Sequence, residues 1–201
     1  MTRETRFRGY LPRAIGFAAI KAALAMSIAV LPVASAHAQG ATIEQRLRHV
    51  EDELAIQRLV LDYAVKLDAR DYDGYVALFA RKGTWQNGST VKHGRSEIRA
   101  MLVDLYGTPP PGFVNTDSYR IVSNVETEIH GDTATAHSRQ LTIMRGENGS
   151  PTPRLSGIYD DELVREEGQW KILHRVDRTI MPSLEQWREQ ISKLRAGQAQ
   201  K

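Results

Sequence analysis

The sequence predicts an α+β domain in which helices come first and a meander of long antiparallel strands follows. Apolar residues recur at helical spacing between residues 43 and 67. Two long β-rich stretches, 119–145 and 155–180, are each divided by a tight-turn signal, at Gly131-Asp132 and at Glu166-Glu167-Gly168. The chain of 201 residues has no cysteine, so a hydrophobic core must stabilise the domain.

The first 38 residues have the pattern of a secretory signal peptide. Four arginines up to Arg13 precede an apolar run from Ala14 to Val33, and Ala36-His37-Ala38 places small residues at a cleavage site. Cleavage after Ala38 would make the mature protein periplasmic or secreted. The alternative is an uncleaved membrane anchor, which Lys21 and Pro32 disfavour because they interrupt a run barely long enough to span a bilayer.

Charge and motifs exclude several classes of function. Residues 1–38 hold five of the 27 basic and one of the 24 acidic residues, which leaves 22 basic against 23 acidic. This balance, without a basic stripe, predicts no nucleic-acid partner, and cleavage predicts no membrane contact. The chain has no His-x-x-x-His set, no Gly-x-Ser-x-Gly and no glycine-rich phosphate loop, so we expect no metal and no cofactor.

The first helix is expected from Ile43 to Leu67, with Asp68 at its end. Its second half turns one face to the core, through Ile56, Leu59, Val60, Tyr63 and Leu67. The other expected elements are a helix 72–80 capped by Asp71, short strands 84–86 and 90–92, a helix 97–106 capped by Ser96, loops at 109–112 and 146–153, strands 119–130, 133–145, 155–165 and 169–180, and a last helix from Leu184. That last helix can dock on the body, pair with a second subunit or fray.

Several short segments follow the order of one known family. They are Tyr63-Ala64-Val65-Lys66-Leu67-Asp68, Gly83-Thr84-Trp85, Gly94-Arg95-Ser96-Glu97-Ile98, Val122-Ser123-Asn124, Tyr159-Asp160-Asp161-Glu162-Leu163 and Gly168-Gln169-Trp170-Lys171-Ile172. Over residues 45–180 the chain resembles the SnoaL-like branch of the nuclear transport factor 2-like superfamily, which includes scytalone dehydratase, bile-acid dehydratase and ketosteroid isomerase. The resemblance implies a cone-shaped barrel, in which a curved, mostly antiparallel sheet wraps around the N-terminal helices and encloses a pocket. It implies a domain at 39–182 and a C-terminal helix or tail at 183–201.

The resemblance also suggests catalytic residues. Asp68 follows Tyr63 by five residues, as in the Tyr/Asp pair of the dehydratases, which makes Asp68 the candidate base and Tyr63 a donor. The alternative is that Asp68 caps the helix end and Tyr63 packs in the core. His137 lies near a pocket histidine of scytalone dehydratase, if its side of the strand faces inwards. Arg120 stands where the dehydratases carry histidine, and it can bind a carboxylate or an oxyanion.

Further residues are candidates for substrate binding. Tyr159 matches an inward polar position of scytalone dehydratase, and Trp85, Tyr106 and Phe113 are candidate apolar lining or ordinary core. His174 shares the parity of Trp170 and Ile172 on the last strand, where it is either a pocket residue or a packed histidine.

Two functions fit these residues. The first is a cofactor-free lyase or isomerase, with dehydratase-type acid–base chemistry on a small apolar or polycyclic carbonyl compound. The second is a non-catalytic periplasmic protein of the same fold that binds a small apolar molecule. A homodimer is plausible in either case, since the outer face of such a sheet usually needs covering.

Overall fold

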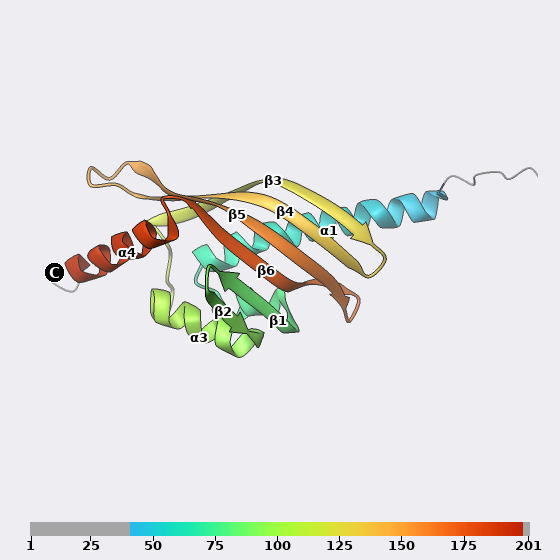
Figure 1. The fold of residues 1–201 in the computed structure, drawn as a ribbon, viewed down its shortest axis with the longest axis horizontal. Coiled ribbons are helices and arrows are strands. Elements are labelled where there is room, and N and C mark those ends of the chain that lie inside the picture. The colour runs from blue at the N-terminus through green and yellow to red at the C-terminus, as the bar shows by residue number, and fades with distance from the viewer. Residues whose placement is uncertain (1–40, 199–201) are drawn as a thin grey trace, which may run out of the picture. The chain divides into compact units, whose positions relative to one another are not determined.

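The computed structural model describes residues 41–198, so the predicted signal peptide lies outside the described residues. The elements are α1 (Ile43–Asp68), α2 (Tyr72–Ala77), β1 (Phe79–Asn87), β2 (Thr90–His93), α3 (Gly94–Tyr106), β3 (Ser118–His130), β4 (Thr133–Arg145), β5 (Pro151–Glu166), β6 (Gln169–Met181) and α4 (Leu184–Gln198) (Figure 1). The predicted order of helices and strands is confirmed, and β4 has the predicted bounds.

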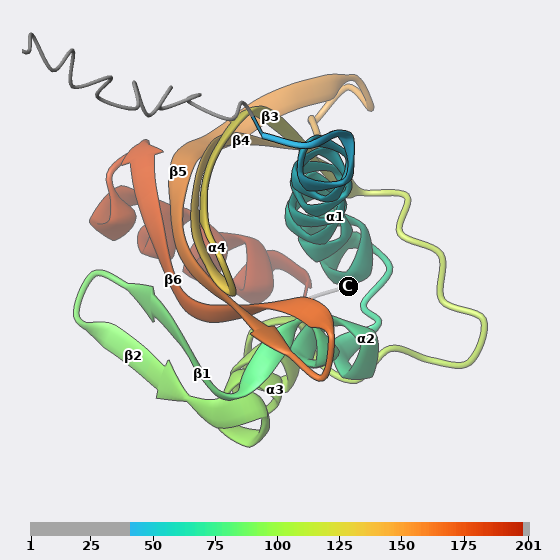
Figure 2. The same ribbon diagram turned by 90° about the vertical axis from the view of Figure 1, so that its right-hand side faces the viewer.

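The six strands form one sheet in the order β2-β1-β6-β5-β4-β3. Only the β1–β6 pair is parallel, and the other four pairs are antiparallel. The sheet curves around α1, and its edges β2 and β3 do not meet (Figure 2). The predicted α+β fold with a curved sheet is therefore confirmed, and its cone stays open at one side.

The core lies between α1 and the concave face of the sheet. The predicted face of α1 is buried, with Ile56, Leu59, Val60, Tyr63 and Leu67 at most 8% exposed. At the start of α1, Thr42 and Gln45 form a capping box, in which each side chain bonds the other's backbone N–H. Burial of this apolar face against the sheet supplies most of the helix's stability.

Of the β-bulges in the sheet, two change which side chains near the site point inwards. In β6 the pairs Leu163–Ile172 and Glu162–His174 leave Leu173 as an extra residue. In β3 an extra residue lies between Ser123 and Glu126, where Asn124 has a φ of 52°. Each extra residue moves the following side chains of its strand to the opposite face.

Some predicted boundaries are wrong. The helix expected to reach Ala80 ends at Ala77, because Phe79 already begins β1. The third helix begins at Gly94 rather than after Ser96, and the Glu97 side chain accepts a bond from the His93 N–H at its start. Residues 151–153, expected in a loop, extend β5. No helix within residues 41–198 is long and apolar enough to cross a membrane.

Candidate functional site

A cavity of about 250 Å³ lies between the concave face of the sheet and the helices. Its walls come from α1, α2, α3, all six strands and α4, which supplies Leu184, Trp187, Arg188 and Ile191. The lining is mainly aromatic and aliphatic, and it also includes the polar or charged residues Asn87, Thr90, Thr142, Thr179 and Arg188. The polar groups relevant to chemistry are Tyr63, Tyr106, Arg120, Gln140, Tyr159 and Asp177. Such a hollow with convergent polar groups is the usual form of a ligand site.

Asp177 is the ionisable carboxyl group that opens into this cavity. The Leu173 bulge turns Arg175, Asp177 and Thr179 to the inner face, and Asp177 then pairs across the sheet with Tyr159. Within the described chain its Oδ1 atom is buried and has no hydrogen-bond partner. Burial raises the pKa of Asp177 to about 6, although Arg175 and Arg120 oppose that rise.

Two phenol groups, those of Tyr63 and Tyr159, lie close enough to Asp177 to be affected by its charge. The Tyr63 ring packs 4.5 Å from that of Tyr75 and 5.2 Å from that of Tyr159, between ring centroids. Burial, with the Asp177 charge next, raises the pKa of Tyr63 to about 12 and that of Tyr159 well above its ordinary value. Both phenols therefore stay neutral near pH 7. The Tyr63 oxygen accepts a bond from Trp85 Nε1 at 3.0 Å, and the Tyr75 phenol is a second hydrogen-bonding neighbour of Tyr63.

A buried ion pair supports these rings from behind. Arg175 and Asp161 are both fully buried and joined by two hydrogen bonds, from Nε to Oδ1 at 2.6 Å and from Nη2 to Oδ2 at 2.5 Å. The Arg175 guanidinium lies 3.8 Å from the Tyr63 ring centroid and 4.5 Å from that of Tyr159. Because Asp161 neutralises it, Arg175 fixes the two rings without adding net charge beside the cavity.

Asp68 is placed differently from Asp177. Its Oδ2 accepts from the Arg120 backbone N–H at 2.8 Å, and its Oδ1 accepts from Arg120 Nη1 at 2.5 Å. Arg120 Nη2 also donates to the Tyr106 hydroxyl at 2.9 Å. Asp68 does not line the cavity, so in this geometry it holds Arg120 in place instead of facing a ligand.

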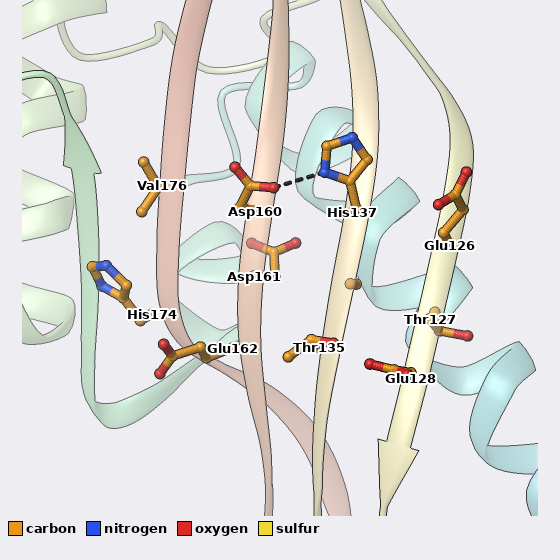
Figure 3. A pocket seen from close by; sticks show the side chains of 11 residues that line it. Glu126, Thr127, Glu128, Thr135, His137, Asp160, Asp161, Glu162, His174 and Val176 are labelled. Atoms are coloured by element: carbon orange, nitrogen blue, oxygen red, sulfur yellow. Dashed lines mark hydrogen bonds and ion pairs between the residues drawn. The ribbon is translucent and has the colours of Figure 1, made fainter.

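A second hollow, of about 580 Å³ and more open, lies on the opposite face of the sheet. His137 lies there with its Nδ1 2.7 Å from Asp160 Oδ1, beside Glu126, Glu128 and Glu162 (Figure 3). His174 also lies on this outer face, bonded through Nδ1 to Thr84 Oγ1. The expectation that these histidines line the inner cavity is therefore wrong, whereas the alternative of a packed histidine bonded to a neighbour describes His174.

The cavity brings together five of the nine predicted site residues, namely Tyr63, Trp85, Tyr106, Arg120 and Tyr159. Asp68, His137 and His174 lie elsewhere, and so does Phe113, whose ring packs 4.4 Å below the Arg70 guanidinium. Sequence reasoning missed Asp177 and Arg175, although Arg-x-Asp-x-Thr on the last strand is an alternating polar pattern. Within residues 41–198, no group of three or more His, Asp or Glu side chains is placed to hold a metal ion.

Comparison with known proteins gives the family. Residues 48–176 match the model of the SnoaL-like domain, so the chain belongs to this family. No curated protein matches the chain.

Solved structures show the same fold. A candidate scytalone dehydratase from Novosphingobium aromaticivorans is 27% identical, with a TM-score of 0.56 over 68% of this chain and 89% of that one. A candidate aromatic ring hydroxylase from the same organism is 25% identical, with a TM-score of 0.55 over 66% and 92%. A cystatin-like-fold protein of unknown function from Nostoc punctiforme is 21% identical, with a TM-score of 0.58 over 67% and 96%. The chain is thus a pocket protein of the SnoaL-like family.

Proposed function

We propose that the protein is a cofactor-independent lyase or isomerase that moves a proton on a small, largely apolar carbonyl compound held in the inner cavity. The observation that carries this proposal is the Asp177 carboxylate, which opens into the cavity beside neutral phenols and has an oxygen without a partner among residues 41–198. A pKa of about 6 leaves Asp177 ionised at pH 7 yet far more basic than an ordinary aspartate. Such a match of pKa to working pH suits a general base.

The reaction divides between Asp177 and the phenols. The Asp177 carboxylate takes a proton from the carbon beside the carbonyl, and the C–H electron pair becomes the C=C bond of an enolate. Tyr63 donates to the enolate oxygen, as an oxyanion-stabilising group. In a lyase, the enolate then expels hydroxide from the next carbon, and that hydroxide takes the Asp177 proton to leave as water. In an isomerase, Asp177 returns the proton to another carbon.

The size and charge of the cavity limit the class of ligand that it can hold. The volume of about 250 Å³ is below the ~300–1,000 Å³ of most ligand pockets, so it favours a compound of one or two rings over a polycyclic one. Among the arginines of the lining, Arg120 is paired with Asp68, whereas Arg188 of α4 donates to Thr90 Oγ1 and has no carboxylate partner among residues 41–198. The names of two relatives, a candidate scytalone dehydratase and a candidate aromatic ring hydroxylase, also support a cyclic ligand.

A generic carbon acid tests the base directly. With 5-nitro-1,2-benzisoxazole, a base takes the ring C–H proton, the C–H electron pair forms a nitrile, and the N–O bond breaks to give a coloured phenolate. The wild-type protein should accelerate this reaction, with a rate that rises through about pH 6 as Asp177 loses its proton. Asp177→Asn should lower the rate by roughly 10²–10⁴-fold.

Two control variants test whether Asp177, and not another carboxylate, is the base. Asp160→Asn alters a carboxylate of the outer hollow, and Asp68→Asn alters the base expected from the sequence. Both should retain most of the rate. A wild-type rate no greater than that of acetate, or an Asp177→Asn variant as fast as wild type, would refute the proposal.

The second candidate, a small-molecule-binding protein without turnover, is favoured by one observation. The carboxylate at the family's Tyr/Asp position, Asp68, has both oxygens bonded to Arg120. A binding protein would take up 2-tetralone, a two-ring ketone, without exchanging the protons beside its carbonyl group. Calorimetry and proton exchange on the same sample separate the two functions.

We also propose export to the periplasm or medium, with cleavage after Ala38. N-terminal sequencing of the protein recovered outside the cytoplasm should begin at Gln39. Recovery with the intact N-terminus in the membrane fraction would favour the anchor instead.

A further inference from the structure

The outward face of α1 carries a continuous apolar stripe that the domain does not cover. Its members, here called the outer stripe, are Ile43, Leu47, Val50, Leu54, Leu61 and Val65. Each is between 42% and 76% exposed. At 100° per residue, the outer stripe lies on the side of α1 opposite Ile56, Leu59 and Tyr63, which face the core. The helix thus has two apolar faces, of which only one is buried.

The spacing of the outer stripe is that of a coiled coil. The steps from Ile43 to Leu47, Val50 and Leu54 are four, three and four residues, and Leu61 follows one heptad after Leu54. These steps place Leu47, Leu54 and Leu61 at the a positions and Ile43, Val50 and the polar Gln57 at the d positions, while Val65 falls at an e position beside the seam. From Ile43 to Val65 the stripe is about 33 Å long at 1.5 Å per residue. The first turns of α1 extend past the sheet, where nothing in the described domain covers them (Figure 1).

The charges beside the outer stripe are self-complementary. The g positions hold Arg46 and Glu53, and the e positions hold Glu51 and Arg58. In a parallel pair, each g residue faces the e residue five positions further along the other helix. Arg46 then meets Glu51 of the second copy, and Glu53 meets Arg58 of the second copy. Within residues 41–198, none of these four side chains forms an ion pair.

From this we propose that the outer stripe of α1 binds the same stripe of a second copy of the chain, as a parallel coiled coil. The mixed signs of the flanks favour a protein helix over a lipid surface, because interfacial helices carry mainly Lys and Arg there. The second copy lies across α1 from the inner cavity and from the sheet. Self-association is therefore independent of the chemistry proposed for the cavity.

The mass of the exported protein in solution tests this proposal. Sedimentation velocity should show two or more copies for the wild type, since Leu at a with β-branched residues at d shifts the preference from two strands to three or four. Leu47→Glu/Leu54→Glu should sediment as one copy with unchanged circular dichroism, because both side chains lie outside the core. A monomeric wild type would overturn the proposal, and so would an oligomer that persists in the Leu47→Glu/Leu54→Glu variant. Binding of a monomeric wild type to lipid vesicles would also overturn it.

Cross-linking tests the parallel register, since the natural chain has no cysteine. In Val50→Cys, a parallel pair brings the two thiols together, so mild oxidation should give a disulfide-linked dimer. Arg48→Cys, on the same turn but beside the stripe, should stay mostly uncross-linked. Equal cross-linking of both variants would contradict an interface formed by the outer stripe.

Exchanging the charges at a flanking pair tests the same pairing without changing any core residue. Glu53→Arg should weaken association several-fold, because it faces Arg58 of the second copy. Adding Arg58→Glu should restore it. Failure of the second change to rescue the first would exclude the parallel pairing.

Discussion

Replacing Asp177 by asparagine should stabilise the protein, and the gain should depend on pH. Burial raises the pKa of Asp177 from 3.8 to about 6 despite Arg175 and Arg120, so ionisation costs stability in the folded protein. A rise of about 2 pKa units corresponds to about 3 kcal/mol at full ionisation. Asparagine carries no such charge, so the variant avoids this cost.

The sign and the pH window follow from the two pKa values. Because the folded pKa is raised, the carboxyl group contributes its full stability only below the unfolded pKa of 3.8, where it is protonated in both states. That stability is lost as the pH rises through about 6. The Asp177→Asn variant should therefore match the wild type near pH 4 and exceed it by about 3 kcal/mol above pH 7.

Thermal unfolding at pH 4, 5, 6, 7 and 8 measures this difference. For a domain of this size, about 3 kcal/mol corresponds to a shift in Tm of ~6–12 °C. Asp73→Asn is the control, since its 82% exposed side chain forms one surface ion pair worth ~0–1 kcal/mol. A difference between Asp177→Asn and wild type that is constant across pH, or a variant less stable at pH 8, would refute the reasoning.

Three more changes probe the supports of the cavity. Arg175→Met should lower the free energy of unfolding by ~3–5 kcal/mol in urea titrations, because Asp161 is left buried and unpaired, and adding Asp161→Leu should recover part of the loss. Gly157→Ala should lower the free energy of unfolding by ~1–3 kcal/mol in the same assay, since a Cβ there would lie 2.7 Å from the Arg178 carbonyl oxygen. An unchanged free energy would mean that the β6 backbone shifts to make room for the methyl group. Asp68→Asn should lower the free energy of unfolding by ~1–3 kcal/mol, because it removes the charged partner of Arg120, and it should change benzisoxazole turnover little. A large loss of turnover would instead indicate that Asp68 is the catalytic base.

The fold was predictable because its signals are local. The apolar spacing of Ile56 to Leu67 fixes the buried face of α1, and Gly131-Asp132 fixes the turn between β3 and β4. Boundaries that depend on tertiary contacts were not predictable. The start of β1 at Phe79 depends on pairing with Ile172, more than ninety residues away in the chain.

The site was predicted only in part, and β6 shows why. Alternation along a strand assigns faces correctly only while no residue is added, and the extra Leu173 inverts the assignment from His174 to Thr179. Strict alternation counted from Trp170 therefore assigns His174 to the inner face and Asp177 to the outer face, the reverse of the structure. Similarly, the Tyr63/Asp68 spacing does not reveal that Arg120 occupies both oxygens of Asp68.

In the proposed reaction, Asp177 moves a proton on a carbonyl compound in the inner cavity while Tyr63 stabilises the enolate oxygen. Uptake of deuterium by 2-tetralone in D₂O, followed by proton NMR, tests it most directly. The wild type should exchange the protons beside the carbonyl group faster than buffer, Tyr63→Phe should be slower, and Asp177→Asn should show only the buffer rate. Equal exchange with wild type and Asp177→Asn would contradict the account.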